Sequence, residues 1–235
     1  MKRLITVISV PLLLGALVGV TCFAGVLYKE DFSEGFNGYG GKVFSYGSGP
    51  NSNGFIVKDG ELDGGNGDGA QEAFLVLTGD PSWRDVAIQA KMRINGQTTG
   101  VAKFIVRAKD DKNYYEFRYT TGRSRVMPDE EASGITSPAG NPNLRIMKVI
   151  NGKWEILAET DDPGIPAIQA NGELAGQSIT FRFEAKGDKL IGYIDDGSGM
   201  KKWLEAIDSG LAEGMVGLGQ YDYAPIWDDL QVESF

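Results

Sequence analysis

Hydrophobic and polar residues alternate along most of this chain from about residue 26 onward. The clearest example is 86–94, where Val86, Ile88 and Met92 fall on one side and Gln89 and Lys91 on the other. A period of two is typical of a β-strand with one buried face. The same alternation predicts strands at 114–119 and 179–185. Short apolar runs predict further strands at 55–57, 74–77, 103–108, 144–150, 154–158, 190–195, 215–219 and 226–235.

Turn residues separate these runs, and no stretch sustains a helical period. Asp59-Gly60, Asn151-Gly152, Gly187-Asp188 and Asp196-Gly197 supply the positive φ that tight hairpins need. About a dozen short strands without βαβ spacing predict an all-β fold, a two-sheet antiparallel β-sandwich. The stretches 127–143 and 161–176 resist strand assignment and are predicted to be long loops, where function often lies.

The alternation also assigns a face to each side chain. The apolar residues of one face are predicted to point between the two sheets. This predicted core comprises Val86, Ile88, Met92, Phe117, Phe181 and Phe183.

The first 24 residues have the order of a secretory signal peptide. Lys2 and Arg3 precede an apolar run over 4–20, and cleavage after Ala24 would leave a single domain at 25–235. The expected location is therefore secreted, periplasmic or at the cell surface, with no membrane span after cleavage. An uncleaved membrane anchor and a lipoprotein acylated at Cys22 are the alternatives. The mature chain would contain no cysteine, so its core must stabilise it.

The amino-acid composition excludes several classes of catalytic and binding site. The chain has 235 residues and no histidine, which excludes Ser-His-Asp and Cys-His triads, imidazole metal sites and histidine bases. The net charge is −9, and an acidic protein is repelled by the phosphate backbone, so a nucleic-acid partner is not expected. Glycine is abundant, at 33 residues, as expected of a fold rich in turns.

Several segments resemble a known superfamily. They are DGELDG from Asp59, SWRDVAIQAKMRI from Ser82, VRAKDDKNYYEFRY from Val106, TFRFEAKGDKLIGYIDD from Thr180 and GMVGLGQYDYAPIWDDLQV from Gly214. Together they resemble the concanavalin A-like jelly-roll superfamily of lectins and glucanases. The resemblance is greatest to LamG-like domains and to the secreted family named for 3-keto-disaccharide hydrolases, and it spans nearly the whole mature chain.

The motifs that carry the resemblance are structural. They are an Arg-x-x-Asp-x-x-Asn-Tyr-Tyr run from Arg107 to Tyr115 and the terminal Trp227-Asp228-Asp229. The resemblance implies a jelly roll and a carbohydrate ligand, because such domains include binding modules, glycoside hydrolases, polysaccharide lyases and adhesion domains. The hydrolase signature Glu-x-Asp-x-x-Glu is absent, and so is the histidine that lyases of this fold commonly use. A contiguous pair such as Asp110 and Asp111 does not provide the two carboxyl groups that flank a sugar in glycosidases.

Four arginines on the polar faces of predicted strands are the first candidates for ligand binding. Arg93, Arg107, Arg118 and Arg182 have guanidinium groups that suit sugar hydroxyls or uronic carboxylates. Arg107 and Arg118 lie on successive predicted strands, so we expect the hairpin to bring both to one surface beside Tyr114. The alternative is a solvated sheet face with cross-strand Arg-Glu pairs.

Trp83 and Tyr221 flank predicted loops, where an aromatic ring could stack on a pyranose. Packing beneath the loops is the alternative role of both rings.

Carboxylates near the two chain ends suggest a structural calcium. Asp31 near the start and Asp228 and Asp229 near the end would be neighbours if the first and last strands pair. The resemblance implies calcium in a comparable place, and turn capping is the alternative. Oxygen ligands at Asp63, Asn66 and Asp68 do not follow the EF-hand spacing, and we interpret them as a hairpin tip.

The sequence therefore predicts a secreted carbohydrate-binding jelly roll that recognises a polysaccharide or other glycan. Two alternatives stay open. One is a polysaccharide-degrading enzyme of the same fold, either a glycoside hydrolase or a lyase, and the other is an envelope adhesion domain.

Overall fold

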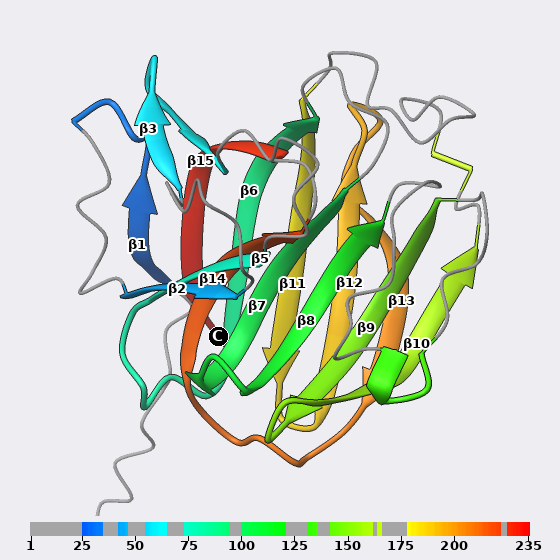
Figure 1. Ribbon diagram of the computed structural model, residues 1–235. Helices are drawn as coiled ribbons and strands as arrows, with labels where there is room; N and C mark the ends of the chain where they lie inside the picture. The colour runs from blue at the N-terminus through cyan, green and yellow to red at the C-terminus, as the bar shows by residue number, and fades with distance from the viewer. Residues whose placement is uncertain are drawn as a thin grey trace, which may run out of the picture.

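Two antiparallel β-sheets pack face to face in the computed structural model of the protein (Figure 1). The structure describes residues 25–34, 42–46, 55–64, 73–94, 100–120, 131–135, 142–161, 164–165, 178–221 and 225–235. The predicted signal peptide, Asn66, Asp68 and most of the two predicted long loops lie outside these residues. Nothing in the described part forms a helix long and apolar enough to cross a bilayer.

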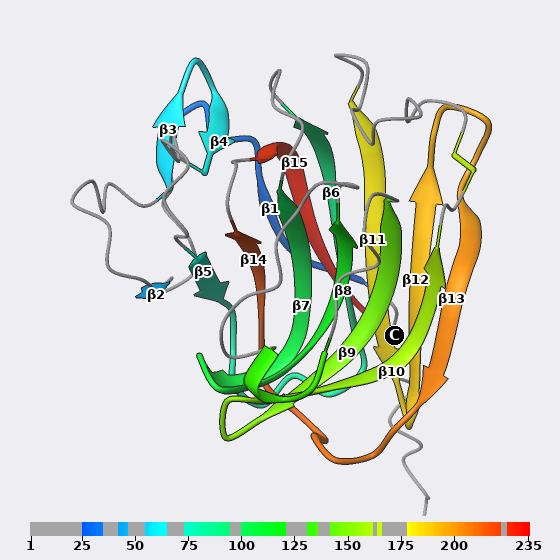
Figure 2. The same cartoon turned by 45° about the vertical axis from the view of Figure 1, so that its right-hand side comes forward.

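The first sheet has eight strands, and the N-terminal strand β1 lies beside the C-terminal strand β15. Its order is β13 (Lys201–Ile207), β12 (Lys189–Asp195), β11 (Ile179–Lys186), β6 (Val86–Ile94), β15 (Pro225–Ser234), β4 (Glu61–Asp63) and β3 (Ile56–Lys58), with β1 (Gly25–Glu30) also on β15. The β3–β4 hairpin stands at one edge of the molecule (Figure 2).

The second sheet has seven strands and lies toward the viewer in Figure 1. Its order is β10 (Lys153–Asp161), β9 (Asn143–Ile150), β8 (Asn113–Thr120), β7 (Val101–Asp110), β14 (Met215–Tyr221), β5 (Ala73–Thr78) and β2 (Lys42–Tyr46). The all-β prediction of a jelly-roll sandwich is confirmed, and the strand predicted at 86–94 coincides with β6. The apolar pattern did not predict β1, β2, β4 or β13.

The predicted core is confirmed. Its six residues are each at most 1% exposed and lie between the sheets. Phe181 of the eight-stranded sheet stacks on Phe104 of the seven-stranded sheet, with ring centroids 5.5 Å apart. Phe117 and Tyr119 are its further aromatic neighbours, at 6.0 and 6.1 Å. One aromatic cluster therefore joins the two sheets.

Candidate functional site

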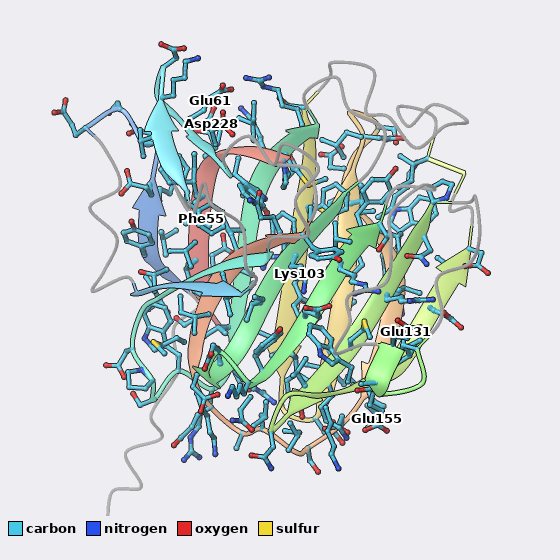
Figure 3. All side chains as sticks on the ribbon, in the orientation of Figure 1. Phe55, Glu61, Lys103, Glu131, Glu155 and Asp228 are labelled. Atoms are coloured by element: carbon cyan, nitrogen blue, oxygen red, sulfur yellow. The ribbon has the colours of Figure 1, made fainter. Side chains whose placement is uncertain are left out.

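The outer face of the seven-stranded sheet carries a row of three cations. The register pairs Lys103 of β7 with Arg118 of β8, and Arg118 with Arg145 of β9. Because cross-strand partners share a face, all three side chains lie on one side of the sheet. They are only 3 to 4% exposed, although they do not point into the core between the sheets. We call this outer face, with Lys103 over its middle in Figure 3, the polar face.

A buried carboxylate and an indole complete the centre of the polar face. Glu116 is fully buried, and its carboxylate lies 3.4 Å from Lys103 Nζ and 3.7 Å from Arg118 Nη1. Lys103 Nζ also lies 4.5 Å from the ring centroid of Trp154, which meets Tyr114 edge to face at 6.0 Å. Trp154 belongs to the edge strand β10. Its side chain packs against apolar clusters that include Tyr114 of β8 and Tyr221 of β14. Its indole therefore reaches across the polar face.

Two neutral polar side chains form the adjacent row. Thr120 and Asn143 are cross-strand partners, two residues along from Arg118 and Arg145. Both are buried, and the Thr120 hydroxyl and both amide atoms of Asn143 have no hydrogen-bond partner among the described residues. Leaving such a group unsatisfied costs about 1 to 3 kcal/mol, so native proteins usually supply water or a ligand. The side chains of this pair have the donors and acceptors needed to form hydrogen bonds with the hydroxyl groups of a bound molecule.

Three of the predicted ligand-binding residues lie on the polar face. Arg118 is in the cation row, Tyr114 contacts Trp154, and Tyr221 packs with Val101 and Trp154. All three remain candidates for ligand contact.

Arg93 and Arg182 lie on the other sheet. Arg93 forms an ion pair with Glu61 of β4, and Arg182 lies 2.6 Å from Glu184 and 2.7 Å from Glu233. Glu184 lies on the same strand as Arg182, whereas the Arg93–Glu61 and Arg182–Glu233 pairs each reach across one intervening strand of the sheet. The two arginines therefore do not join Arg118 on one surface.

Arg107 is a structural residue at one end of the sandwich. Its guanidinium donates to the carbonyl oxygens of Arg84, Leu211 and Gly187 at 2.9, 3.1 and 2.8 Å. The expectation that Arg107 and Arg118 share a surface is therefore wrong. The reason is a register shift between Val106 and Asp110, where Arg107 has a φ of 52°, so the alternation on β7 breaks just at this residue.

Trp83 is also placed at an end of the sandwich. It is partly buried against the core cluster, and its carbonyl oxygen accepts from Gly214 N at 2.9 Å. A Cβ on Gly79 would lie 2.1 Å from the Trp83 ring, so a glycine is needed beneath the indole. These contacts fit the alternative role that the sequence left open for Trp83, which is packing under a loop.

The first and last described strands, β1 and β15, pair with each other, which is the condition that the calcium hypothesis required. Asp31 and Asp229 line one cleft on the outer face of the eight-stranded sheet, while Asp228 accepts the backbone N–H of Asp229. The Asp229 carboxylate lies 2.5 Å from Lys91 Nζ, and this hydrogen bond raises the pKa of Lys91. The described residues contain no group of three or more carboxylates that could hold a metal ion.

Sequence reasoning missed most of the polar face. The residues it did not select are Lys103, Thr120, Asn143, Arg145 and Trp154. The signal for the first four was polar side chains at outward positions of otherwise apolar strands. Their assembly into adjacent rows depends on cross-strand register, which a single strand's pattern does not contain.

Comparison with known proteins identifies the fold. No family model matches the chain, and no curated protein matches it. Among solved structures, the carbohydrate-binding module CBM66 from Bacillus subtilis is 21% identical, covers 84% of this chain and 98% of its own, and has a TM-score of 0.58.

Two further structures have the same architecture. A protein with a galectin-like fold from Bacillus subtilis is 12% identical, with a TM-score of 0.59, over 89% of this chain and 96% of its own. The exoplasmic domain of VIP36, bound to Ca²⁺ and Man3GlcNAc, is 11% identical, with a TM-score of 0.53, over 82% of this chain and 83% of its own. The chain therefore shares its β-sandwich fold with these three structures.

Proposed function

We propose that this chain is a secreted glycan-binding protein whose ligand occupies the polar face. The observation that carries the proposal is the cation row of Lys103, Arg118 and Arg145 beside the buried Thr120–Asn143 pair. A glycan offers hydroxyl groups that both donate and accept, which is what a threonine hydroxyl and an asparagine amide require. The predicted signal peptide at 1–24 would bring the domain to where extracellular polysaccharides are found.

The charges of the polar face favour an acidic glycan. Three cations lie with two carboxylates, those of Glu116 and Glu159, and Arg145 Nε contacts Glu159 at 3.1 Å. A guanidinium binds a carboxylate by charge-assisted hydrogen bonds, which are about twice as strong as neutral ones. Trp154 adds an amphipathic ring of the kind that packs on the apolar side of a pyranose.

The named similar structures support the same class of ligand. One is a carbohydrate-binding module, and another was solved with Man3GlcNAc bound. Their identity to this chain is low, so they support a sugar ligand without specifying which sugar.

The test compares one arginine on each sheet. Arg145→Gln and Arg93→Gln each remove a cation that forms an ion pair with a glutamate. Glu159 lies on the strand next to Arg145, and Glu61 lies beyond the intervening strand β15 from Arg93. We expect Arg145→Gln to weaken binding of an acidic polysaccharide, such as polygalacturonate, by about tenfold or more, because it removes a charge-assisted contact. Arg93→Gln should bind like the wild type. Affinity electrophoresis and isothermal titration calorimetry measure both variants after circular dichroism has shown that each is folded.

Salt and product analysis extend the same experiment. Binding of an acidic glycan to the polar face should weaken as salt is added, whereas binding of a neutral glycan should change little. Equal affinity of wild type and folded Arg145→Gln across neutral and acidic polysaccharides would contradict the proposed site. Release of new reducing ends or unsaturated uronates would instead indicate the enzyme alternative.

Calcium at the chain ends is not supported by the donors that the structure describes. Ca²⁺ takes six to eight oxygen ligands, yet the cleft pairs Asp229 with the ammonium group of Lys91. We therefore expect excess EDTA to leave the melting temperature unchanged. A ligand that binds only the folded state raises stability by mass action, so a lower melting temperature in chelator, reversed by added calcium, would restore the calcium prediction.

A further inference from the structure

A cleft of about 540 Å³ opens on the outer face of the eight-stranded sheet, remote from the polar face. It lies over β11, β6, β15 and the segment at the end of β1. Its lining includes Gln89, Lys91, Thr180, Asp229, Leu230 and Gln231. The volume is in the range of small-molecule sites, which are about 300 to 1,000 Å³.

A β-bulge shapes this cleft. Asp228 pairs with Lys91 and Gln231 pairs with Gln89, so β15 has one more residue than β6 between these two pairs. Within the bulge Asp229 has a φ of 50°, a conformation that costs a non-glycine residue free energy and that aspartate tolerates better than most. The ion pair with Lys91 holds the Asp229 carboxylate at the cleft, while Leu230 is buried in the core. Bulges often re-aim side chains in this way next to functional sites.

The lining offers both donors and acceptors with little net charge. Lys29 and Lys91 stand against Glu30, Asp31 and Asp229, so the ionised groups nearly balance. Gln89, Gln231 and Thr180 add two amides and a hydroxyl. The Gln89 amide oxygen also accepts from Arg182 at 3.5 Å, and the Gln231 amide nitrogen donates to Glu233, so the Gln89 amide nitrogen and the Gln231 amide oxygen are the groups offered to a ligand. Such a surface suits a neutral ligand with many hydroxyl groups better than a strongly charged one.

We propose that this cleft is a second carbohydrate site, which takes a neutral sugar unit of up to disaccharide size. It goes beyond the proposed function, because it lies on the opposite sheet and uses none of the residues of the polar face. With both sites occupied, one molecule would hold two glycan segments on opposite sides of the sandwich, which raises avidity for a polysaccharide network.

One NMR titration reads the two sites separately. The side-chain amides of Gln89 and Gln231 report on the cleft, and that of Asn143 reports on the polar face. We expect a neutral disaccharide, tested as maltose, cellobiose and sucrose in turn, to shift the Gln89 and Gln231 signals saturably. Digalacturonate should shift Asn143 instead. A glutamine response without an asparagine response would support the cleft while contradicting the polar face, and the reverse would do the opposite.

Two conservative variants test the cleft chemistry. Thr180→Val removes a hydroxyl with little change of shape, and Asp229→Asn removes the charge that holds Lys91 while keeping a residue that tolerates positive φ. Each should weaken disaccharide binding by about tenfold, the effect of losing one good hydrogen bond. Lys202→Gln, on the exposed surface of β13, is the control that should bind normally. The proposal is overturned if none of the three sugars shifts the glutamine amides, or if calcium shifts them and the sugars do not.

Discussion

Replacing Phe181 by alanine is expected to lower the free energy of unfolding by about 3 to 5 kcal/mol. Phe181 is fully buried and stacks on Phe104, with Phe117 and Tyr119 as further aromatic neighbours. Its loss removes buried apolar area and leaves a cavity that rings from both sheets border. Urea unfolding followed by tryptophan fluorescence measures the change.

Ile207→Ala is the matched control for Phe181→Ala. Ile207 is 59% exposed on the edge strand β13, so its truncation should change the unfolding free energy by about 0.5 kcal/mol or less. A loss below about 1 kcal/mol for Phe181→Ala would show that the ring is not part of the common core of the two sheets.

Arg107→Met is expected to destabilise the fold by about 3 kcal/mol or more. Methionine has a similar length but cannot donate, so it leaves the carbonyl oxygens of Arg84, Leu211 and Gly187 without their present donor. Burial lowers the pKa of the Arg107 guanidinium, and the nearby Asp85 carboxylate partly offsets this effect. The measurement is equilibrium unfolding in urea.

Arg84→Met supplies the comparison for Arg107. The Arg84 side chain is 72% exposed and pairs with Glu213 at 3.0 Å, and exposed ion pairs of this kind contribute about 0 to 1 kcal/mol. If Arg107→Met were as mild as Arg84→Met, the three carbonyl contacts would not stabilise the native state. A stability loss would also make Arg107 variants unsuitable for testing glycan binding, since weak binding would then reflect unfolding.

Much of this fold could be predicted from the sequence, because strand alternation is a local property. The period of two placed Phe117 and Phe181 in the core, and it correctly put Glu116 and Arg118 on the opposite side of their strand. Turn residues such as Asn151-Gly152 marked the hairpin between β9 and β10. The strand that pattern missed most clearly, β4, has only three residues, too few to show a period.

The functional faces were decided by tertiary structure. The alternation of apolar and polar residues shows which side of its own strand a residue occupies. It does not show to which sheet the strand belongs, because strands of both sheets carry polar residues on their outer faces. Arg93 and Arg118 therefore looked equivalent along the chain, although they lie on opposite sheets. Only the register between β7, β8 and β9 aligns Lys103 with Arg118 and Arg145. Likewise, only the irregular register at Arg107 and at Asp229 changes the direction in which the side chains of these two residues point. The sequence by itself determined the sandwich and its core, while the pairing of distant strands determined which polar groups meet.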